Sequence, residues 1–154
     1  MNRNERGPTI LVVEDNKDNQ VIMQAWLEHA SYRVLLADNG HAGVALAQSE
    51  VPDAILMDVA LPGIDGWDAA AAIRSHPRTR KIPIIALTAL ALPEGRERAA
   101  VAGVDGYLTK PATLLRVLEE LERVLGRGGA FQRSTAPSTV DPTKDRDSGL
   151  GANS

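Results

Sequence analysis

The sequence predicts an α/β fold in which a parallel five-stranded sheet is covered by helices on both faces. Short apolar runs of strand length recur along the chain, and each is followed by a segment of helical character. The runs are continuous rather than alternating, which is typical of strands that are buried on both faces. Strands that alternate with helices in this way form a parallel sheet with right-handed connections.

Length and composition exclude several classes of protein and several kinds of site. The chain has 154 residues and no cysteine, so one domain is expected, without disulfides or thiolate metal sites. A formal net charge of -3 without a long basic block argues against nucleic-acid binding. The longest apolar stretch, residues 84–92, is too short to cross a bilayer, and the N-terminus lacks a secretory signal. We expect a cytoplasmic protein that binds no membrane.

Three strands and three helices are expected in the first half of the chain, after a polar and flexible N-terminus over residues 1–8. They are, in order, strand 9–13, helix 16–30, strand 32–37, helix 42–49, strand 54–58 and helix 65–75. Asp15 or Asn16 can cap the first helix and Asp65 the third, because short polar side chains accept hydrogen bonds from a helix N-terminus. Asn39-Gly40 separates the second strand from its helix.

The second half of the domain is expected to contain strand 82–87, helix 93–102, strand 107–109 and helix 112–126. The fourth helix is weak, because it contains Gly95 and its apolar stripe is poor. The last helix has a strong stripe, formed by Leu114, Val117, Leu118, Leu121, Val124 and Leu125. From residue 127 onward Ser, Thr, Pro, Gly and Asp dominate. We therefore expect a folded domain over residues 9–126 and a disordered tail over 127–154.

Five strands connected in this way suit the flavodoxin-like (βα)5 fold, with the strand order 2-1-3-4-5. Strands 1 and 3 are then neighbours, and ligands bind beyond their carboxyl ends. Glu14 and Asp15 follow strand 1, and Asp58 ends strand 3. Thr88 and Lys110 follow strands 4 and 5 at the same edge. The predicted topology therefore gathers three carboxylates, a hydroxyl and an ammonium group.

Three carboxylates in one cleft repel one another unless they share protons or bind a cation. Mg²⁺ prefers such oxygen ligands, and a carboxylate can also accept a phosphoryl group as an aspartyl phosphate. Lys110 and Thr88 could then neutralise and hydrogen-bond the phosphoryl oxygens. Each residue alone has an ordinary alternative as a helix cap, a strand-end hydroxyl or a surface lysine. Their joint occurrence at four strand ends favours the phosphoryl site.

Four sequence blocks carry a resemblance to a known family. They are VVEDN (12–16), LMD with LPGIDG (56–58 and 61–66), ALTA (86–89) and GYLTKP (106–111). In order and spacing, residues 8–126 resemble the receiver domains of response regulators in two-component signalling, of the chemotaxis type. The resemblance implies that Asp58 is the phosphoacceptor. It also implies that Glu14, Asp15, Asp58 and the backbone carbonyl of Ala60 hold Mg²⁺.

The same resemblance assigns roles at the other strand ends. Thr88 is expected to be the switch hydroxyl, Tyr107 the switch aromatic, and Lys110 the partner of the phosphoryl group. The Lys110-Pro111 peptide bond is expected to be cis. The face formed by helix 93–102, strand 107–109 and helix 112–126 is the expected output surface.

The implied function is that of a single-domain response regulator. It would be phosphorylated by a histidine kinase or a histidine phosphotransfer protein and would signal to a downstream protein that the sequence does not identify. It is not expected to be an enzyme beyond its own phosphorylation and dephosphorylation. The alternative is a phosphorelay intermediate that passes the phosphoryl group to another histidine. No DNA-binding or catalytic module follows residue 126, so direct control of transcription is not expected. The chain could also be a piece of a larger hybrid kinase, although Met1 and the long tail argue against this. Charge on the last two helices is compatible with a homodimer.

A stripe on the first helix, Asn19, Ile22 and Trp26, is expected beside the acidic pocket and could dock the donor's helices. The alternative is that Trp26 packs in the core. The positions two residues after Asp58 and Thr88 are Ala60 and Leu90. Neither side chain can position an attacking water, so we expect slow self-dephosphorylation.

Two other classes of protein share parts of this pattern. A phosphatase with an aspartyl nucleophile expects a second Asp at position 60, where this chain has Ala60. A flavodoxin-like electron carrier expects a phosphate-binding loop after the first strand, where this chain has the charged residues 14–18. Both departures argue against these alternatives.

Overall fold

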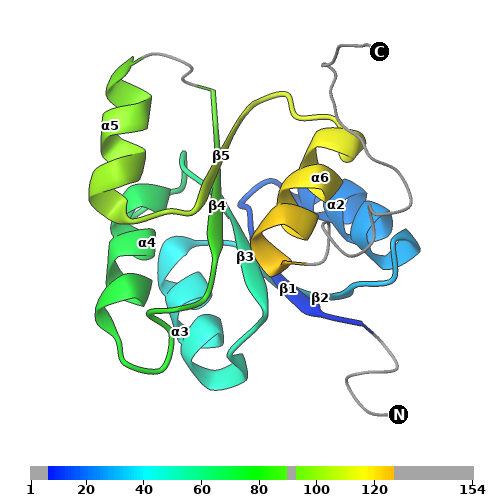
Figure 1. The fold of residues 1–154 in the computed structure, drawn as a ribbon, viewed down its shortest axis with the longest axis horizontal. Coiled ribbons are helices and arrows are strands. Elements are labelled where there is room, and N and C mark those ends of the chain that lie inside the picture. Colours follow the sequence, from blue (N-terminus) through cyan, green and yellow to red (C-terminus); the bar gives the residue numbers. More distant parts are fainter. Residues whose placement is uncertain (1–6, 90–92, 127–154) are drawn as a thin grey trace, which may run out of the picture. The chain divides into compact units, whose positions relative to one another are not determined.

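A parallel five-stranded sheet forms the centre of the fold, with the strand order β2-β1-β3-β4-β5 (Figure 1). This confirms the predicted order. The strands are β1 (Thr9–Val13), β2 (Arg33–Ala37), β3 (Ala54–Asp58), β4 (Ile84–Thr88) and β5 (Gly106–Thr109). Every residue of β1, β3 and β4 is buried, as expected of strands that are covered on both faces.

The structure is a computed structural model that describes residues 7–89 and 93–126, without the side chains of 93–96. The predicted tail over 127–154, the first six residues and Leu90 lie outside the described residues. Contacts divide the chain into two units, residues 1–120 and 121–154. The whole sheet belongs to the first unit. Among the described helices, none is long and apolar enough to pass through a lipid bilayer.

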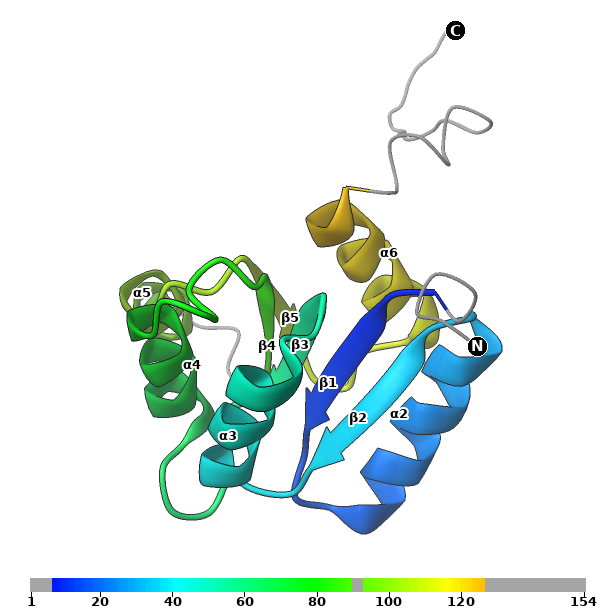
Figure 2. The ribbon, with the colours of Figure 1, turned by 90° about the horizontal axis from the view of Figure 1, so that it is seen from below.

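Five helices connect and follow the strands in the described part of the chain. They are α2 (Lys17–His29), α3 (Gly40–Glu50), α4 (Gly66–Ser75), α5 (Pro93–Ala102) and α6 (Leu114–Leu125). Helices α3, α4 and α5 lie side by side on one side of the sheet, and α2 lies on the other (Figures 1 and 2). Because all neighbouring strands are parallel, the strand-to-helix loops lie together at the carboxyl edge of the sheet.

The starts of α2 and α4 follow the predicted capping residues, whereas the starts of α3 and α6 each differ from the prediction by two residues, α6 beginning at Leu114 rather than at residue 112. Asn16 caps α2 by accepting the Asn19 N–H, and Asp65 caps α4. Helix α3 begins at Gly40 rather than at residue 42, because Asn39 caps it and accepts the Ala42 N–H. Gly40 belongs to the packed region, since a Cβ there would lie 2.6 Å from a side-chain carbon of Ile64.

At the opposite edge of the sheet, one guanidinium group that the sequence pattern does not single out makes four polar contacts. Arg74, at the end of α4, donates from Nε to the Gly103 carbonyl at 2.7 Å. Its Nη1 donates to the carbonyls of Arg80 and Ile82 at 2.9 and 2.6 Å, and its Nη2 pairs with Asp105. One side chain therefore joins the end of α4 to the loops that precede β4 and β5.

We expect Arg74→Met to lower the free energy of unfolding by about 2–4 kcal/mol, because it removes the donor that three backbone carbonyls and the Asp105 carboxylate share. Urea denaturation followed by circular dichroism measures this. Arg116→Met is the matched control, because Arg116 forms an exposed pair with Glu119 at 3.3 Å, and removing it should cost less than about 0.5 kcal/mol. Equal losses in the two variants would contradict the role given to Arg74.

Candidate functional site

Three carboxylates meet at the carboxyl edge of the sheet. Strands β1 and β3 pair in register, with Val13 opposite Met57, so the residues that follow emerge side by side. One oxygen each of Glu14, Asp15 and Asp58 can be chosen so that all three lie within 4.8 Å of one another. Glu14 and Asp58 are buried, whereas Asp15 is exposed. The topology therefore creates the acidic cluster that the strand order predicted.

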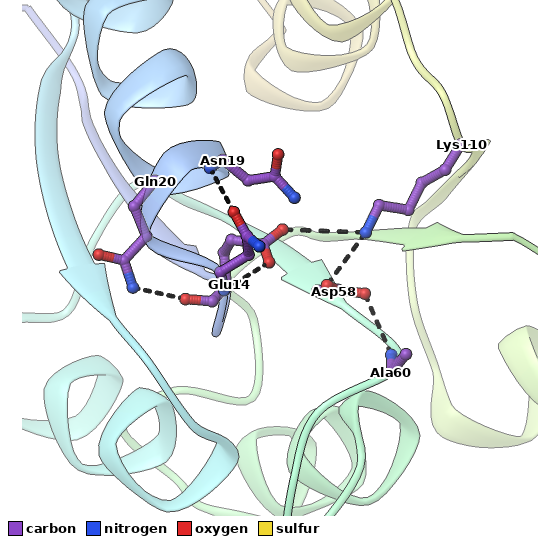
Figure 3. Close-up of polar contacts among 7 residues, drawn as sticks. Glu14, Asn19, Gln20, Asp58, Ala60 and Lys110 are labelled. Atoms are coloured by element: carbon purple, nitrogen blue, oxygen red, sulfur yellow. Dashed lines mark hydrogen bonds and ion pairs between the residues drawn. The ribbon is translucent and has the colours of Figure 1, made fainter.

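Glu14 is fixed in place by three hydrogen bonds, of which Figure 3 shows those to Asn16 and Gln20. Its N–H donates to the Ala37 carbonyl at 2.9 Å, and its own carbonyl accepts from Gln20 Nε2 at 2.6 Å. One carboxylate oxygen accepts the Asn16 N–H at 3.0 Å. The role of Gln20 is not visible in the sequence, because the pattern of an amphipathic helix does not distinguish a buried glutamine that binds a backbone carbonyl from a glutamine on the surface.

Asp58 is 3% exposed and lies between two donors. Its Oδ1 accepts the Ala60 N–H at 3.0 Å, and its Oδ2 lies 3.1 Å from Lys110 Nζ (Figure 3). The same ammonium lies 3.8 Å from Glu14 Oε1. Lys110 therefore bridges two buried carboxylates, and a single positive charge faces both.

The loop between Asp58 and the start of α4 is closed by a backbone hydrogen bond. The Gly66 N–H donates to the Val59 carbonyl at 2.9 Å, which closes the loop at the start of α4. A Cβ at Gly66 would lie 2.3 Å from the Asp58 carbonyl oxygen, so only glycine fits there. This close approach explains why the loop after Asp58 needs glycine at its end.

The remaining predicted residues lie on the last two strands. Thr88 is buried at the end of β4, opposite Thr109, and its carbonyl accepts the Lys110 N–H at 2.7 Å. The peptide bond between Lys110 and Pro111 is cis. Tyr107 is half-buried in β5, opposite Ala86. The structure thus joins Thr88 to Lys110 through the backbone and places Tyr107 farther back along its strand.

A mainly apolar groove of about 460 Å³ adjoins the acidic cluster. Its lining residues are Glu14, Asn19, Ile22, Met23, Trp26, Leu87, Lys110, Pro111 and Ala112. Ile22 is 47% exposed, and Trp26 is half-buried on the groove wall rather than enclosed in the core. The stripe predicted on the first helix therefore faces the groove and lies beside the carboxylates.

The charges of the cluster are not balanced by its own residues. Burial raises the pKa of Glu14, and the nearby Asp58 charge adds to this, while the Asn16 N–H and Lys110 oppose it. A hard cation would relieve this repulsion, because carboxylate oxygens are its preferred ligands. The donor set therefore fits Mg²⁺.

We expect Glu14→Gln to stabilise the metal-free protein at neutral pH. Because the folded state binds the Glu14 proton more tightly than the unfolded chain, wild-type stability should fall as pH rises above the unfolded pKa of about 4.5. The variant should lack this fall and should gain less stability from Mg²⁺. Urea titrations over pH, with and without chelator, measure both effects. Identical pH dependence in the two proteins would contradict this assignment.

Solved structures with this fold include the receiver domain of sensor histidine kinase PA1611 from Pseudomonas aeruginosa PAO1, crystallised with a magnesium ion coordinated in the active site cleft. It is 43% identical, has a TM-score of 0.73, and the match covers 78% of this chain and 98% of that one. Chemotaxis response regulator CheY4 of Vibrio cholerae is 30% identical, with a TM-score of 0.72 over 76% of this chain and 98% of that one.

Relatives of known function fall into two groups. Sensor histidine kinase GacS of Pseudomonas protegens is 40% identical over 109 residues, which cover 69% of this chain but only 12% of that protein. The polar-differentiation response regulator DivK of Brucella anthropi is 32% identical over 118 residues, which cover 77% of this chain and 96% of that protein. The chain therefore matches one small part of the kinase and nearly all of the regulator.

The family model of the response regulator receiver domain matches residues 10–122. This match covers the sheet, the acidic cluster and Lys110. Together with the relatives and the solved structures, it shows that this chain belongs to the response regulator receiver domain family of two-component signalling.

Proposed function

We propose that Asp58 accepts a phosphoryl group from a phosphohistidine of a histidine kinase or a histidine phosphotransfer protein. The observation that carries this proposal is the position of Asp58, a buried carboxylate beside Glu14 and Asp15 and 3.1 Å from Lys110 Nζ. Receiver domains are signalling modules rather than enzymes with a separate substrate. In this proposal the chain therefore catalyses only its own phosphorylation and dephosphorylation.

In the proposed reaction, an Asp58 carboxylate oxygen forms a bond to phosphorus while the phosphorus–nitrogen bond of the donor breaks. The electron pair of that bond stays on the imidazole nitrogen. Lys110 compensates the charge of the phosphoryl oxygens, and the Ala60 N–H is directed at the same carboxylate. Glu14, Asp15, Asp58 and the Ala60 carbonyl would hold Mg²⁺, which supplies further charge neutralisation when bound.

The proposed readout begins at Thr88 and Tyr107. Thr88 is joined to Lys110 by the hydrogen bond between their backbones, so a change at Lys110 can reach the end of β4. The proposed output surface comprises α5, β5 and the start of α6. Val101 and Leu115 support it, because their side chains are 88% and 65% exposed and large exposed apolar groups favour protein contacts. The same surface could serve a homodimer.

Two pathways are compatible with this chemistry. The match to nearly the whole of DivK supports a single-domain response regulator with a protein target. The matches to GacS and PA1611 support the alternative, a phosphorelay intermediate that passes the phosphoryl group to another histidine. In both, the receiver domain spans residues 9–126 and works in the cytoplasm, without nucleic acid or membrane.

The apolar groove beside the cluster is the proposed donor-docking site. Asn19, Ile22 and Trp26 line it from α2, and Lys110 and Pro111 line it from the loop after β5. A donor helix seated there would bring its phosphohistidine toward Asp58. Burial of the exposed part of Ile22 would contribute to docking.

Incubation with Mg²⁺ and acetyl phosphate tests the phosphoacceptor. We expect intact-mass spectrometry to show the addition of one phosphoryl group, which chelator prevents and Asp58→Asn abolishes. The control is Asp68→Asn, which changes an exposed carboxylate outside the cluster and should gain the same mass. Equal labelling of the Asp58 variant and the wild type would contradict the proposal.

Donor docking is tested with the phosphorylated core of a kinase that transfers to the wild type. Ile22→Asp should slow this transfer by about tenfold, because it places a charge in the apolar groove. Labelling by acetyl phosphate should be unchanged. Val21→Asp is the control, because Val21 is 65% exposed and does not line the groove. Similar transfer rates in the two variants would argue against docking there.

Self-dephosphorylation should be slow, because the methyl group of Ala60 cannot orient a water beside Asp58. Leu90, the second position expected to matter, lies outside the described residues. Ala60→Asn should shorten the half-life of the phosphorylated protein several-fold, since an amide can orient the attacking water. Decay of the phosphorylated mass measures this. A wild-type half-life as short as that of the fastest chemotaxis-type receivers would refute the prediction.

A further inference from the structure

The described side chains of α5, those of residues 97–102, have little apolar attachment to the rest of the domain. Among its described side chains, the buried ones are Ala99 and Ala102, and Val101 is 88% exposed. A buried methyl group removes little apolar surface from water, so two alanines fix a helix weakly. Polar contacts therefore have a larger share in setting the position of α5 than they have for α4, which buries Trp67 and Ile73.

Two arginines provide these contacts, and they differ in strength. Arg74 holds the C-terminal end of α5 through the 2.7 Å hydrogen bond to the Gly103 carbonyl, and its side chain is only 21% exposed. Arg98, within α5, lies 3.5 Å from an Asp65 oxygen and 5.9 Å from the centre of the Trp67 ring. Its side chain is 54% exposed.

Asp65 connects this second contact to the phosphoacceptor loop. Its Oδ1 accepts the Asp68 N–H at 2.9 Å and caps α4, which leaves Oδ2 for Arg98. The loop that ends at Asp65 begins at Asp58, where the Ala60 N–H is bound to the carboxylate. The Gly66 N–H bond to Val59 closes this loop, so Ala60 and Asp65 belong to one hydrogen-bonded segment.

We infer that Arg98 is a positioning residue that couples the loop after Asp58 to helix α5. This inference rests on the proposed function. Phosphorylation converts the Asp58 oxygens into an acyl phosphate and changes the acceptor of the Ala60 N–H. An exposed ion pair is worth about 0.2–1 kcal/mol, so the Arg98 contact can be broken by such a change, whereas the bonds of Arg74 remain. The Arg98 contact thus stabilises the unphosphorylated position of α5, and Arg74 acts as the fixed end.

The coupling can be measured, because breaking the Arg98–Asp65 pair and binding a phosphoryl group at Asp58 must affect each other equally. If the Arg98–Asp65 pair is broken in the phosphorylated state, its removal must favour that state. With Mg²⁺ and fluoroberyllate as a stable phosphoryl mimic, we expect Arg98→Met to bind the mimic roughly 1.5- to 5-fold more tightly than the wild type. Asp65→Asn keeps an acceptor for the helix cap and should give the same gain. The double variant should gain no more than either single variant.

A second readout needs neither metal nor mimic. In the metal-free protein, Arg98→Met should increase amide hydrogen exchange in α5 and leave exchange in α2 unchanged. Arg116→Met removes an exposed ion pair on another helix. It should change neither amide hydrogen exchange in α5 nor the affinity for the mimic. Unchanged or weaker binding in both Arg98→Met and Asp65→Asn, or additive gains in the double variant, would overturn the inference while Asp58 labelling remains. Loss of labelling in the wild type would instead overturn the proposed function and this inference with it.

Discussion

The bridge from Lys110 to two buried carboxylates is the interaction on which the site depends. Asp58 and Glu14 come from neighbouring strands, and the parallel register brings their charges together whether or not they are balanced. One ammonium at 3.1 and 3.8 Å balances only part of this charge, and burial makes the remainder costly. The cluster is therefore suited to binding a cation, which would offset the negative charge that Lys110 leaves unbalanced.

The carboxyl edge of the sheet carries the acidic cluster, whereas the amino edge is fixed by the contacts of Arg74. At the carboxyl edge, one hydrogen bond from the Ala60 N–H holds Asp58 Oδ1. The hydrogen bond from the Gly66 N–H to the Val59 carbonyl closes the loop after Asp58, so the residues of this loop can move only together. At the amino edge, Arg74 makes several bonds at once and ties the connections before β4 and β5. We therefore expect a change of charge at the carboxyl edge to leave the structure of the amino edge unchanged. Helix α5, which Arg98 and Arg74 connect to its surroundings, is the element that we infer changes position when the charge at Asp58 changes.

Sequence patterns predicted the topology and the cluster because both follow from strand order. Continuous apolar runs indicated the parallel sheet, and residues after strands must then meet at one edge, which placed Glu14, Asp58 and Lys110 correctly. The braces were not predictable. Gln20, Arg74 and Arg98 are polar residues on helices, and their partners are mostly backbone carbonyls or distant side chains that only the packed structure identifies. The predicted starts of α3 and α6 are also wrong by two residues. Asn39-Gly40 does follow the second strand as predicted, but Gly40 already belongs to α3 and packs against Ile64.

The central claim is that Asp58 itself becomes the aspartyl phosphate. Borohydride reduces an acyl phosphate to an alcohol, so it converts a phosphorylated aspartate into homoserine and releases phosphate. After labelling with Mg²⁺ and acetyl phosphate, reduction and peptide mapping by mass spectrometry should find homoserine at position 58 and nowhere else. Homoserine at position 15, or a labelled protein that yields none at position 58, would contradict the account.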